Sequence, residues 1–176
     1  NGELMLSRML GVAMTIVRMA EERPKADKDR DPDYQERNFS RYEQGLQSFD
    51  KRYNEKMDKA VMKLALSRAL KKDAAERTPA LDVVIGKKAT TDAIPSSVEA
   101  FYKGTKLGEV ATRLALLKTA TTKELRASKD TFIALALNLR PLMKAEEERD
   151  EKFQGRLASL KPVYFDALRA FEGKDI

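Results

Sequence analysis

The sequence predicts an all-α protein, an irregular bundle of about seven helices in which long helical pairs are joined by short helices. Apolar residues recur three or four positions apart along nearly every segment, and convincing strands are missing. Residues that open and close helices punctuate these segments. Apolar side chains make up 42% of the 176 residues, enough for a buried core beside 35% charged residues.

The first helix is expected over residues 3–22, and Pro24 ends it. Its apolar residues at helical spacing are Leu6, Met9, Leu10, Ala13, Val17 and Ala20. The uncharged run inside it, residues 9–17, is much shorter than the ~20 residues that cross a bilayer. We therefore expect a buried amphipathic helix and no membrane span.

A second helix is expected after the charged loop 24–33, and it ends near Tyr53. Asp33 and Glu36 have the spacing of a capping box at its start. One stripe along it consists of Tyr34, Asn38, Tyr42, Leu46, Phe49 and Tyr53. Such a stripe is either the wall of a ligand groove or a core face whose tyrosine hydroxyls reach water, and we favour the core face.

A third helix is expected over residues 55–75, with Asn54 as its N-cap. Its apolar face is predicted to include Met57, Val61, Leu64 and Ala65 and to extend to Leu70. The second and third helices form either an antiparallel hairpin with a tight turn or one long bent helix.

Several short helices are expected next. Thr78 and Pro79 open one that ends near Gly86, and another covers residues 107–118. Two capping boxes open further helices: Ser96 with Glu99, in a helix that Gly104 ends, and Thr121 with Glu124.

The last helical stretch, residues 129–171, contains two prolines. Pro141 is expected to kink or end its first apolar segment. Pro162 interrupts a stripe formed by Phe153, Leu157, Leu160, Tyr164, Leu168 and Phe171. Because proline inside a helix costs ~3 kcal/mol unless the backbone bends, a kink is expected near Leu160.

These elements predict a single helical domain over residues 1–176, as part of a larger protein. Residues 87–95 are the candidate hinge, because they combine two lysines, two threonines, an Asp and a Pro with few apolar side chains. The first residue is Asn1 rather than Met, which favours a fragment or a processed product.

Composition excludes several kinds of chemistry. The sequence has no cysteine and no histidine, so it cannot build a thiolate metal site, a disulfide or a Ser-His-Asp triad by itself. We expect no catalytic, cofactor-binding or metal-binding residue in this chain, and no cofactor.

Two acidic clusters are candidate metal sites. The loop with Asp27, Asp29, Asp31 and Asp33 lacks the glycine and glutamate that an EF-hand needs. The cluster of Glu146, Glu147, Glu148, Asp150 and Glu151 lacks the histidines of a diiron bundle. We interpret the second cluster as a solvated face. The charges of residues 19–38 favour ion pairs that lock a helix-loop-helix turn over presentation of a charge to a substrate.

The net charge of +6 is concentrated in residues 54–128, which hold 15 basic and 9 acidic residues. One interpretation is that Lys56, Lys59 and Lys63 form the solvated face of a helix. The alternative is a stand-alone helical binding module that uses segment 54–128 to bind an acidic partner. We expect no nucleic-acid partner, because no aromatic platform or Gly-rich loop accompanies the lysines.

Several longer motifs carry a family resemblance. They are SRMLGVAMTIVRMAEERPK, DPDYQERN, TPALD, FYKGTKLGEVATRLAL, SKDTFIALALNLRP and GRLASLKPVYFDALRAF. In this order, from Ser7 to Phe171, they resemble the helical domain of the bacterial dipeptidyl-peptidase 7/11 and dipeptidyl aminopeptidase BII family. They are packing and turn motifs, so the resemblance rests on their combination.

The resemblance implies a function for the whole protein. In that family a chymotrypsin-like double β-barrel carries the Ser-His-Asp triad, and an inserted helical domain caps the cleft. It implies a serine exopeptidase that releases dipeptides from free N-termini of peptides, uses no metal, is periplasmic or secreted, and is a candidate homodimer. By the same resemblance the triad and the residues that bind the substrate amine lie outside this chain, which would be inactive alone.

Overall fold

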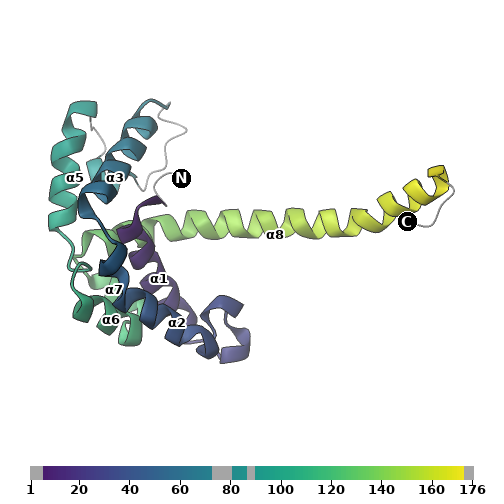
Figure 1. Cartoon of the computed structure of the whole chain (residues 1–176), viewed down its shortest axis with the longest axis horizontal. Helices are drawn as coiled ribbons and strands as arrows, with labels where there is room; N and C mark the ends of the chain where they lie inside the picture. Colours follow the sequence, from purple (N-terminus) through teal and green to yellow (C-terminus); the bar gives the residue numbers. More distant parts are fainter. Residues whose placement is uncertain (1–5, 73–80, 87–89, 173–176) are drawn as a thin grey trace. The chain divides into compact units, whose positions relative to one another are not determined.

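The computed structural model describes residues 6–72, 81–86 and 90–172 (Figure 1). These residues form eight α-helices and several 3₁₀ turns, and no strand occurs among them, which confirms the predicted all-α class. In the same ranges, no helix combines the length and low charge of a membrane span. The chain divides into two compact units, residues 1–139 and residues 140–176. Each unit is described by itself.

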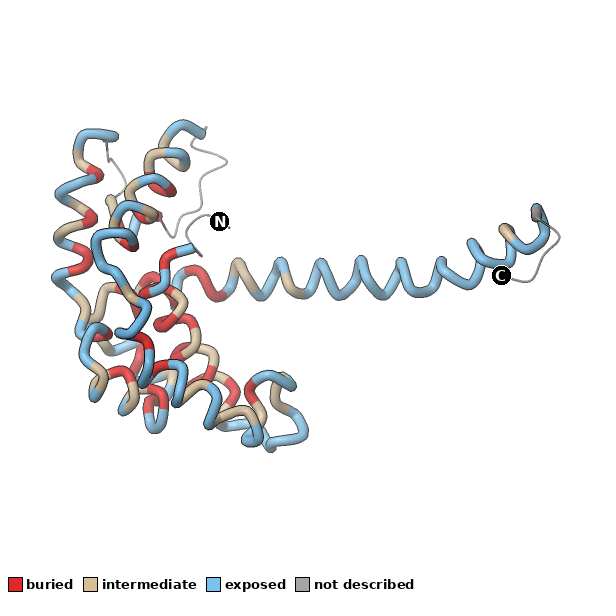
Figure 2. Tube along the Cα trace, in the orientation of Figure 1, coloured by how far each residue is buried: buried red, intermediate tan, exposed pale blue. Residues whose placement is uncertain are grey.

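Helix α1, Arg8–Glu22, is the most buried element of the first unit (Figure 2). It begins later than predicted, because Ser7 is its N-cap and the Ser7 hydroxyl accepts a hydrogen bond from the Leu10 N–H, at 3.3 Å. Leu6 precedes the helix and is 66% exposed, so it does not belong to the buried face. The helix ends at Glu22, ahead of Pro24 as predicted.

The predicted capping box of Asp33 and Glu36 is wrong. Two 3₁₀ turns occupy this part of the loop, Asp27–Asp29 and Pro32–Tyr34. The cap of the second turn is Asp31, whose carboxylate accepts from the Asp33 N–H at 2.9 Å. Helix α2, Glu36–Gln47, starts after Gln35 without a side-chain cap.

Helix α2 ends before Tyr53, and a 3₁₀ turn, Phe49–Arg52, follows it. The aromatic stripe splits into two stacked pairs, Tyr34 with Tyr42 at 5.1 Å and Phe49 with Tyr53 at 4.6 Å between ring centroids. Tyr34, Leu46 and Phe49 are buried, which confirms the predicted core face. The prediction that the tyrosine hydroxyls reach water is wrong at Tyr53, whose hydroxyl is buried.

Helix α3, Glu55–Leu70, begins after Asn54 as predicted, with the Met57 N–H donating to the Asn54 side chain at 3.1 Å. The predicted buried face is right at Ala65 but wrong at Met57 and Leu64. Met57 and Leu64 are 65% and 53% exposed, and the buried residues are Asp58, Met62, Ala65 and Leu66. The helix is rotated relative to the prediction because a carboxylate, Asp58, is directed inward to bind the start of α1.

The next helices are short. Helix α4, Asp82–Ile85, ends at Gly86, which has a φ of 76° that favours glycine. The predicted opening at Thr78 and Pro79 lies outside the described residues, as do positions 87–89 of the predicted hinge. A 3₁₀ turn, Thr91–Ala93, leads into α5, Ile94–Lys103. The hinge stays a prediction.

Helix α5 corrects a second predicted capping box. Pro95 occupies its first turn, and the Ser96 hydroxyl donates to the Ala93 carbonyl at 3.0 Å instead of capping the helix. Glu99 binds lysines of α3 instead. The helix ends at Gly104, as predicted.

Helix α6, Val110–Thr119, starts three residues later than predicted. Helix α7, Thr122–Ala127, opens with the predicted capping box, since Thr121 and Glu124 bind each other's backbone N–H groups. Hydrogen bonds to its carboxylate from the Thr121 N–H and then from the Thr121 hydroxyl lower the pKa of Glu124.

Helix α8, Thr131–Glu172, runs through Pro141 and Pro162 without an interruption in its assignment. Pro141 therefore does not end it. Figure 1 shows the ribbon changing direction in the yellow part of the helix, the segment that contains Pro162. This change of direction agrees with the predicted kink, because proline removes one helical hydrogen bond and crowds the preceding turn.

The core of the first unit gathers around α1. Helix α1 contacts α6 and α7, α2 contacts α6, and α5 contacts α3 and α4. The part of α8 that belongs to this unit contributes Phe132, Ile133, Leu135, Ala136 and Leu139, all buried. Edge-on contacts join Phe132 to Phe101 and Tyr102, at 4.8 and 4.9 Å between ring centroids.

Gly104→Ala should destabilise the fold by about 1–3 kcal/mol, because the added Cβ would overlap Cγ2 of Thr131. Thr131 cannot turn away freely, since its hydroxyl donates to the Phe101 carbonyl at 2.6 Å. The measurement is the urea midpoint by circular dichroism. The double variant Gly104→Ala/Thr131→Ser, which lacks Cγ2, should recover most of the loss; equal midpoints for the single and double variants would contradict the close approach.

Candidate functional site

Asp58 of α3 is a buried carboxylate that accepts four hydrogen bonds. It accepts from the backbone N–H groups of Arg8 at 2.6 Å and Met9 at 3.2 Å. It also accepts from the hydroxyls of Ser7 at 3.1 Å and Tyr102 at 2.8 Å. A carboxylate from one helix thus caps the positive N-terminal end of another.

This cluster has the wrong chemistry for nucleophilic catalysis. Ser7 donates to a carboxylate that already accepts three other hydrogen bonds, and no imidazole stands between them to take a proton. Burial raises the pKa of Tyr102, and the neighbouring Asp58 charge adds to the rise. The tyrosine is therefore held neutral as a hydrogen-bond donor. The cluster is structural.

Arg113 of α6 is a second buried charge, with a fully buried side chain. Its guanidinium donates to the Leu46 carbonyl at 2.7 Å and to the carbonyls of Leu107 and Gly108 at 3.2 and 2.8 Å. It also forms an ion pair with Asp50 at 2.8 Å. Arg113 thereby ties the end of α2 to the segment that leads into α6.

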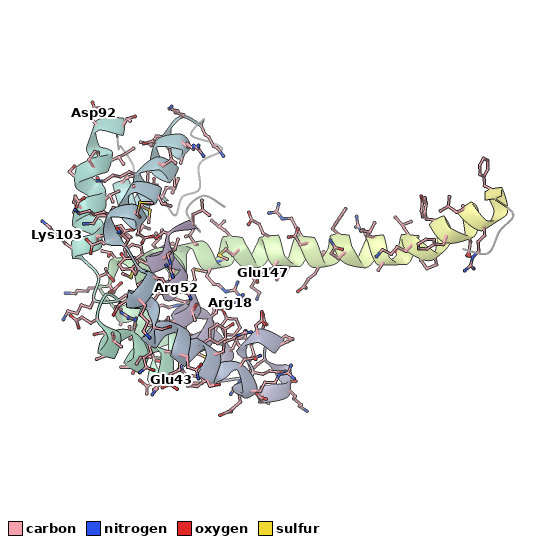
Figure 3. All side chains as sticks on the ribbon, in the orientation of Figure 1. Arg18, Glu43, Arg52, Asp92, Lys103 and Glu147 are labelled. Atoms are coloured by element: carbon pink, nitrogen blue, oxygen red, sulfur yellow. The ribbon has the colours of Figure 1, made fainter. Side chains whose placement is uncertain are left out.

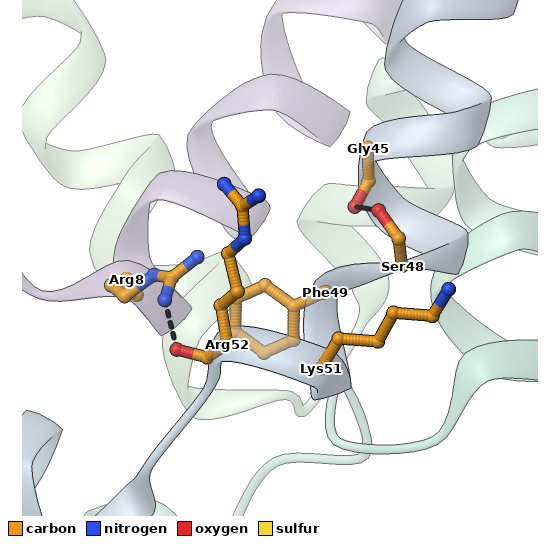
Figure 4. Close-up of a pocket in the computed structure, with 6 residues that line it drawn as sticks. All are labelled: Arg8, Gly45, Ser48, Phe49, Lys51 and Arg52. Carbon is orange, nitrogen blue, oxygen red and sulfur yellow. Dashed lines mark hydrogen bonds between the residues drawn. The ribbon is translucent and has the colours of Figure 1, made fainter.

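A basic pocket of about 460 Å³ lies where the start of α1 meets the end of α2 (Figure 4). Its lining residues are Arg8, Gly45, Ser48, Phe49, Lys51 and Arg52. Arg8 donates to the Arg52 carbonyl and lies 5.6 Å from the centre of the Phe49 ring. Figure 4 shows the Arg8 guanidinium to the left of that ring, the Arg52 guanidinium above it, and the Lys51 ammonium to its right. The name basic pocket is used for these six residues below.

The basic pocket keeps its positive charge. In the described part of the chain, no carboxylate forms an ion pair with Arg8, Lys51 or Arg52. A second pocket, of about 220 Å³, also holds cations: Arg23, Arg30 and Lys118. There Arg30 pairs with Asp27 at 3.3 Å, Lys118 pairs with Glu43, and Arg23 donates to the carbonyl of Ala120. In the second pocket, therefore, two of the three cations are paired with carboxylates.

In the loop with Asp27, Asp29, Asp31 and Asp33, carboxylates bind protein groups, and these bonds are structural. Asp31 pairs with Arg18 at 2.6 Å, and Asp27 accepts from the Glu36 N–H at 2.7 Å. The buried Glu22 accepts from Lys25 and from the Asp31 N–H. These bonds support the predicted locking of residues 19–38.

The lysines of segment 54–128 are partly neutralised as well. Lys59 binds Glu55 at 2.6 Å and Glu99 at 2.7 Å, and Lys63 binds Glu99 at 3.2 Å. Hydrogen bonds from Lys59 and then Lys63 lower the pKa of Glu99. The two pairs with Glu99 join α3 to α5, which weakens the case for segment 54–128 as a free basic face. The binding-module alternative stays a hypothesis.

The second unit displays an apolar stripe. Large hydrophobic side chains of α8 are exposed: Phe153, Leu157, Leu160, Val163, Tyr164, Phe165 and Phe171. Five of them, at 153, 157, 160, 164 and 171, follow the spacing of one helix face. Near the start of this unit, Arg140 pairs with Glu147 of the acidic cluster at 3.1 Å. We call the five residues the α8 stripe.

Three of these features were not predicted from the sequence: the buried carboxylate of Asp58, the buried guanidinium of Arg113 and the basic pocket. The pocket had one signal, the adjacent cations Lys51 and Arg52 at the end of a predicted helix. Asp58 and Arg113 had no signal in the sequence, because groups that bind each of them are distant along the chain.

Comparison with known proteins agrees with the resemblance. The family model described as Peptidase S46 matches residues 1–176. The Asp/Glu-specific dipeptidyl-peptidase of Shewanella putrefaciens (strain CN-32 / ATCC BAA-453) is 28% identical over 162 residues. That match covers 92% of this chain and 22% of the relative, so the chain spans about a fifth of the relative's length. By the match over its whole length, the chain belongs to the peptidase S46 family.

Proposed function

We propose that this chain is part of the α-helical cap of a serine exopeptidase that releases dipeptides from free N-termini of peptides. Family membership is the observation that carries the proposal. The similar Shewanella protein is named a dipeptidyl-peptidase, and the chain corresponds to a fifth of its length. The cap gates access to the cleft, and the chemistry belongs to a chymotrypsin-like double β-barrel of the same parent chain.

The residues of this chain favour a role without chemistry. It has no histidine and no cysteine, and its buried charges are bound to backbone groups. The α8 stripe supports contact with another part of the parent protein, because exposed apolar side chains in one row are typical of an interface. We further propose a periplasmic or secreted location and a homodimer.

The test is dipeptide release by the intact parent protein. Substrates are matched peptides with free and with acetylated N-termini. We expect release from the free form, with at least a hundredfold lower rate for the acetylated form, and no release by the 176-residue chain alone. Equal cleavage of both forms, or release by the isolated chain, would contradict the proposal.

A variant of the α8 stripe tests the cap contact within the same assay. Leu160→Glu should lower the rate of the parent protein about tenfold, because a buried interface does not tolerate an unpaired charge. The matched control is Ser159→Glu, which adds the same charge at an exposed neighbour. If both variants retain full activity while the parent remains an exopeptidase, the stripe is not the contact.

A further inference from the structure

The basic pocket offers three cations to a ligand without competition from the protein. Arg52 and Lys51 are exposed, and the Arg8 guanidinium is anchored by a carbonyl, which leaves its positive charge uncancelled. Guanidinium groups bind carboxylates through paired N–H donors, and an ammonium adds a point charge. The arrangement suits more than one negative charge.

The volume of the basic pocket is too large for a lone ion. About 460 Å³ corresponds to roughly fifteen water molecules at ~30 Å³ each. Pockets of this size are typical of ligands with several heavy groups. Beside the cations, the Phe49 ring forms an apolar part of the wall. Gly45, which has no side chain, forms a flat part of it. A ligand with a carbon skeleton and two carboxylates fits this wall.

We infer that the basic pocket binds an acidic segment of a peptide, through two neighbouring carboxylates. The ligand's identity as a peptide rests on the proposed function, whereas its double negative charge rests on the pocket itself. The pocket acts as a docking site for peptide chains, with one carboxylate held between Arg8 and Arg52 and the other near Lys51.

The probe is the peptide acetyl-Ala-Glu-Glu-amide, titrated into the 176-residue chain by calorimetry at low salt. Acetyl-Ala-Gln-Gln-amide has the same shape without charge, and inorganic phosphate is the simple-anion arm. We expect saturable binding of the acidic peptide, at least tenfold weaker binding of phosphate, and none of the glutamine peptide. Affinity should fall as salt shortens the screening length.

Two variants locate the binding. Lys51→Gln/Arg52→Gln should weaken binding of the acidic peptide at least tenfold. The matched control Arg37→Gln/Lys103→Gln removes the same charges from exposed positions outside the pocket and should change the affinity less than twofold. Figure 3 shows Lys103 and Arg52 on different elements. Gly45→Leu should also weaken binding, because it narrows the pocket without changing charge; a Cβ there meets no atom within 4 Å.

The outcomes separate this inference from the proposed function. Binding is measured on this chain and needs no cleavage, so it can fail while the parent protein remains an exopeptidase. Equal weakening in the two charge-matched double variants would overturn the site. Phosphate binding as tight as that of the acidic peptide would overturn the peptide assignment, and so would the absence of saturation.

Discussion

Asp58→Ala is expected to lower the free energy of unfolding of the first unit by roughly 3–5 kcal/mol. The substitution leaves four donors without their acceptor: the N–H groups of Arg8 and Met9 and the hydroxyls of Ser7 and Tyr102. Hydrogen bonds to a charged group contribute ~1.5–3 kcal/mol each, and buried unsatisfied donors add to the loss. Urea unfolding followed by circular dichroism measures the effect.

Two controls separate the cap from a general loss of charge. Asp92→Ala removes an exposed carboxylate and should change stability by less than ~0.5 kcal/mol. Amide exchange should accelerate at Arg8 and Met9 in the Asp58 variant, because their hydrogen bonds are lost. A stability loss as small as that of Asp92→Ala would show that Asp58 does not hold the start of α1.

Tyr102 gives this cluster a pH dependence. Its pKa is raised in the folded state by burial and then by Asp58, above the ordinary value of ~10. Because the pKa of Tyr102 is higher in the folded state than in the unfolded state, the unfolded chain releases the tyrosine proton first as the pH rises. The folded state therefore loses stability once the pH exceeds the unfolded-state pKa. The native chain should therefore lose stability above pH ~10, and Tyr102→Phe should lose less over the same range.

Arg113→Met is expected to cost about 3–5 kcal/mol, although methionine is apolar and of similar length. The side chain is fully buried, and its loss leaves the carbonyls of Leu46, Leu107 and Gly108 without these donors. Removing one partner of a buried charged network costs more than the network contributes as a whole. The urea midpoint is again the measurement.

The conservative variant defines what Arg113 does. Arg113→Lys should recover less than half of the loss, because one ammonium cannot reach both the end of α2 and the carbonyls at 107 and 108. Asp50→Ala should cost only ~1 kcal/mol, since the Asp50 side chain is half exposed. Arg126→Met, at an exposed position, serves as the control. A larger effect at Asp50 than at Arg113 would assign the stability to the ion pair.

Local signals predicted the helices well where the cap and the helix are neighbours in sequence. Asn54 and the Thr121–Glu124 box cap helices as expected, because their bonds close within three residues. The same kind of signal failed at Asp33 and Ser96. At both positions a 3₁₀ turn precedes the α-helix: the first turn includes Asp33, and the second ends before Ser96. A 3₁₀ turn and the start of an α-helix differ only in whether the hydrogen bond spans three or four residues.

The chain's sequence by itself determined the all-α class, most helix ends and the lack of histidine or cysteine chemistry, because periodicity, caps and composition act locally. Tertiary structure decided which face of α3 is buried, why Asp58 and Arg113 lie inside, and where the basic pocket forms. The physical reason is distance along the chain: the partners of Asp58 are 44–51 residues away, and the Leu46 carbonyl is 67 residues from Arg113. Only the packed helices bring those donors and acceptors together.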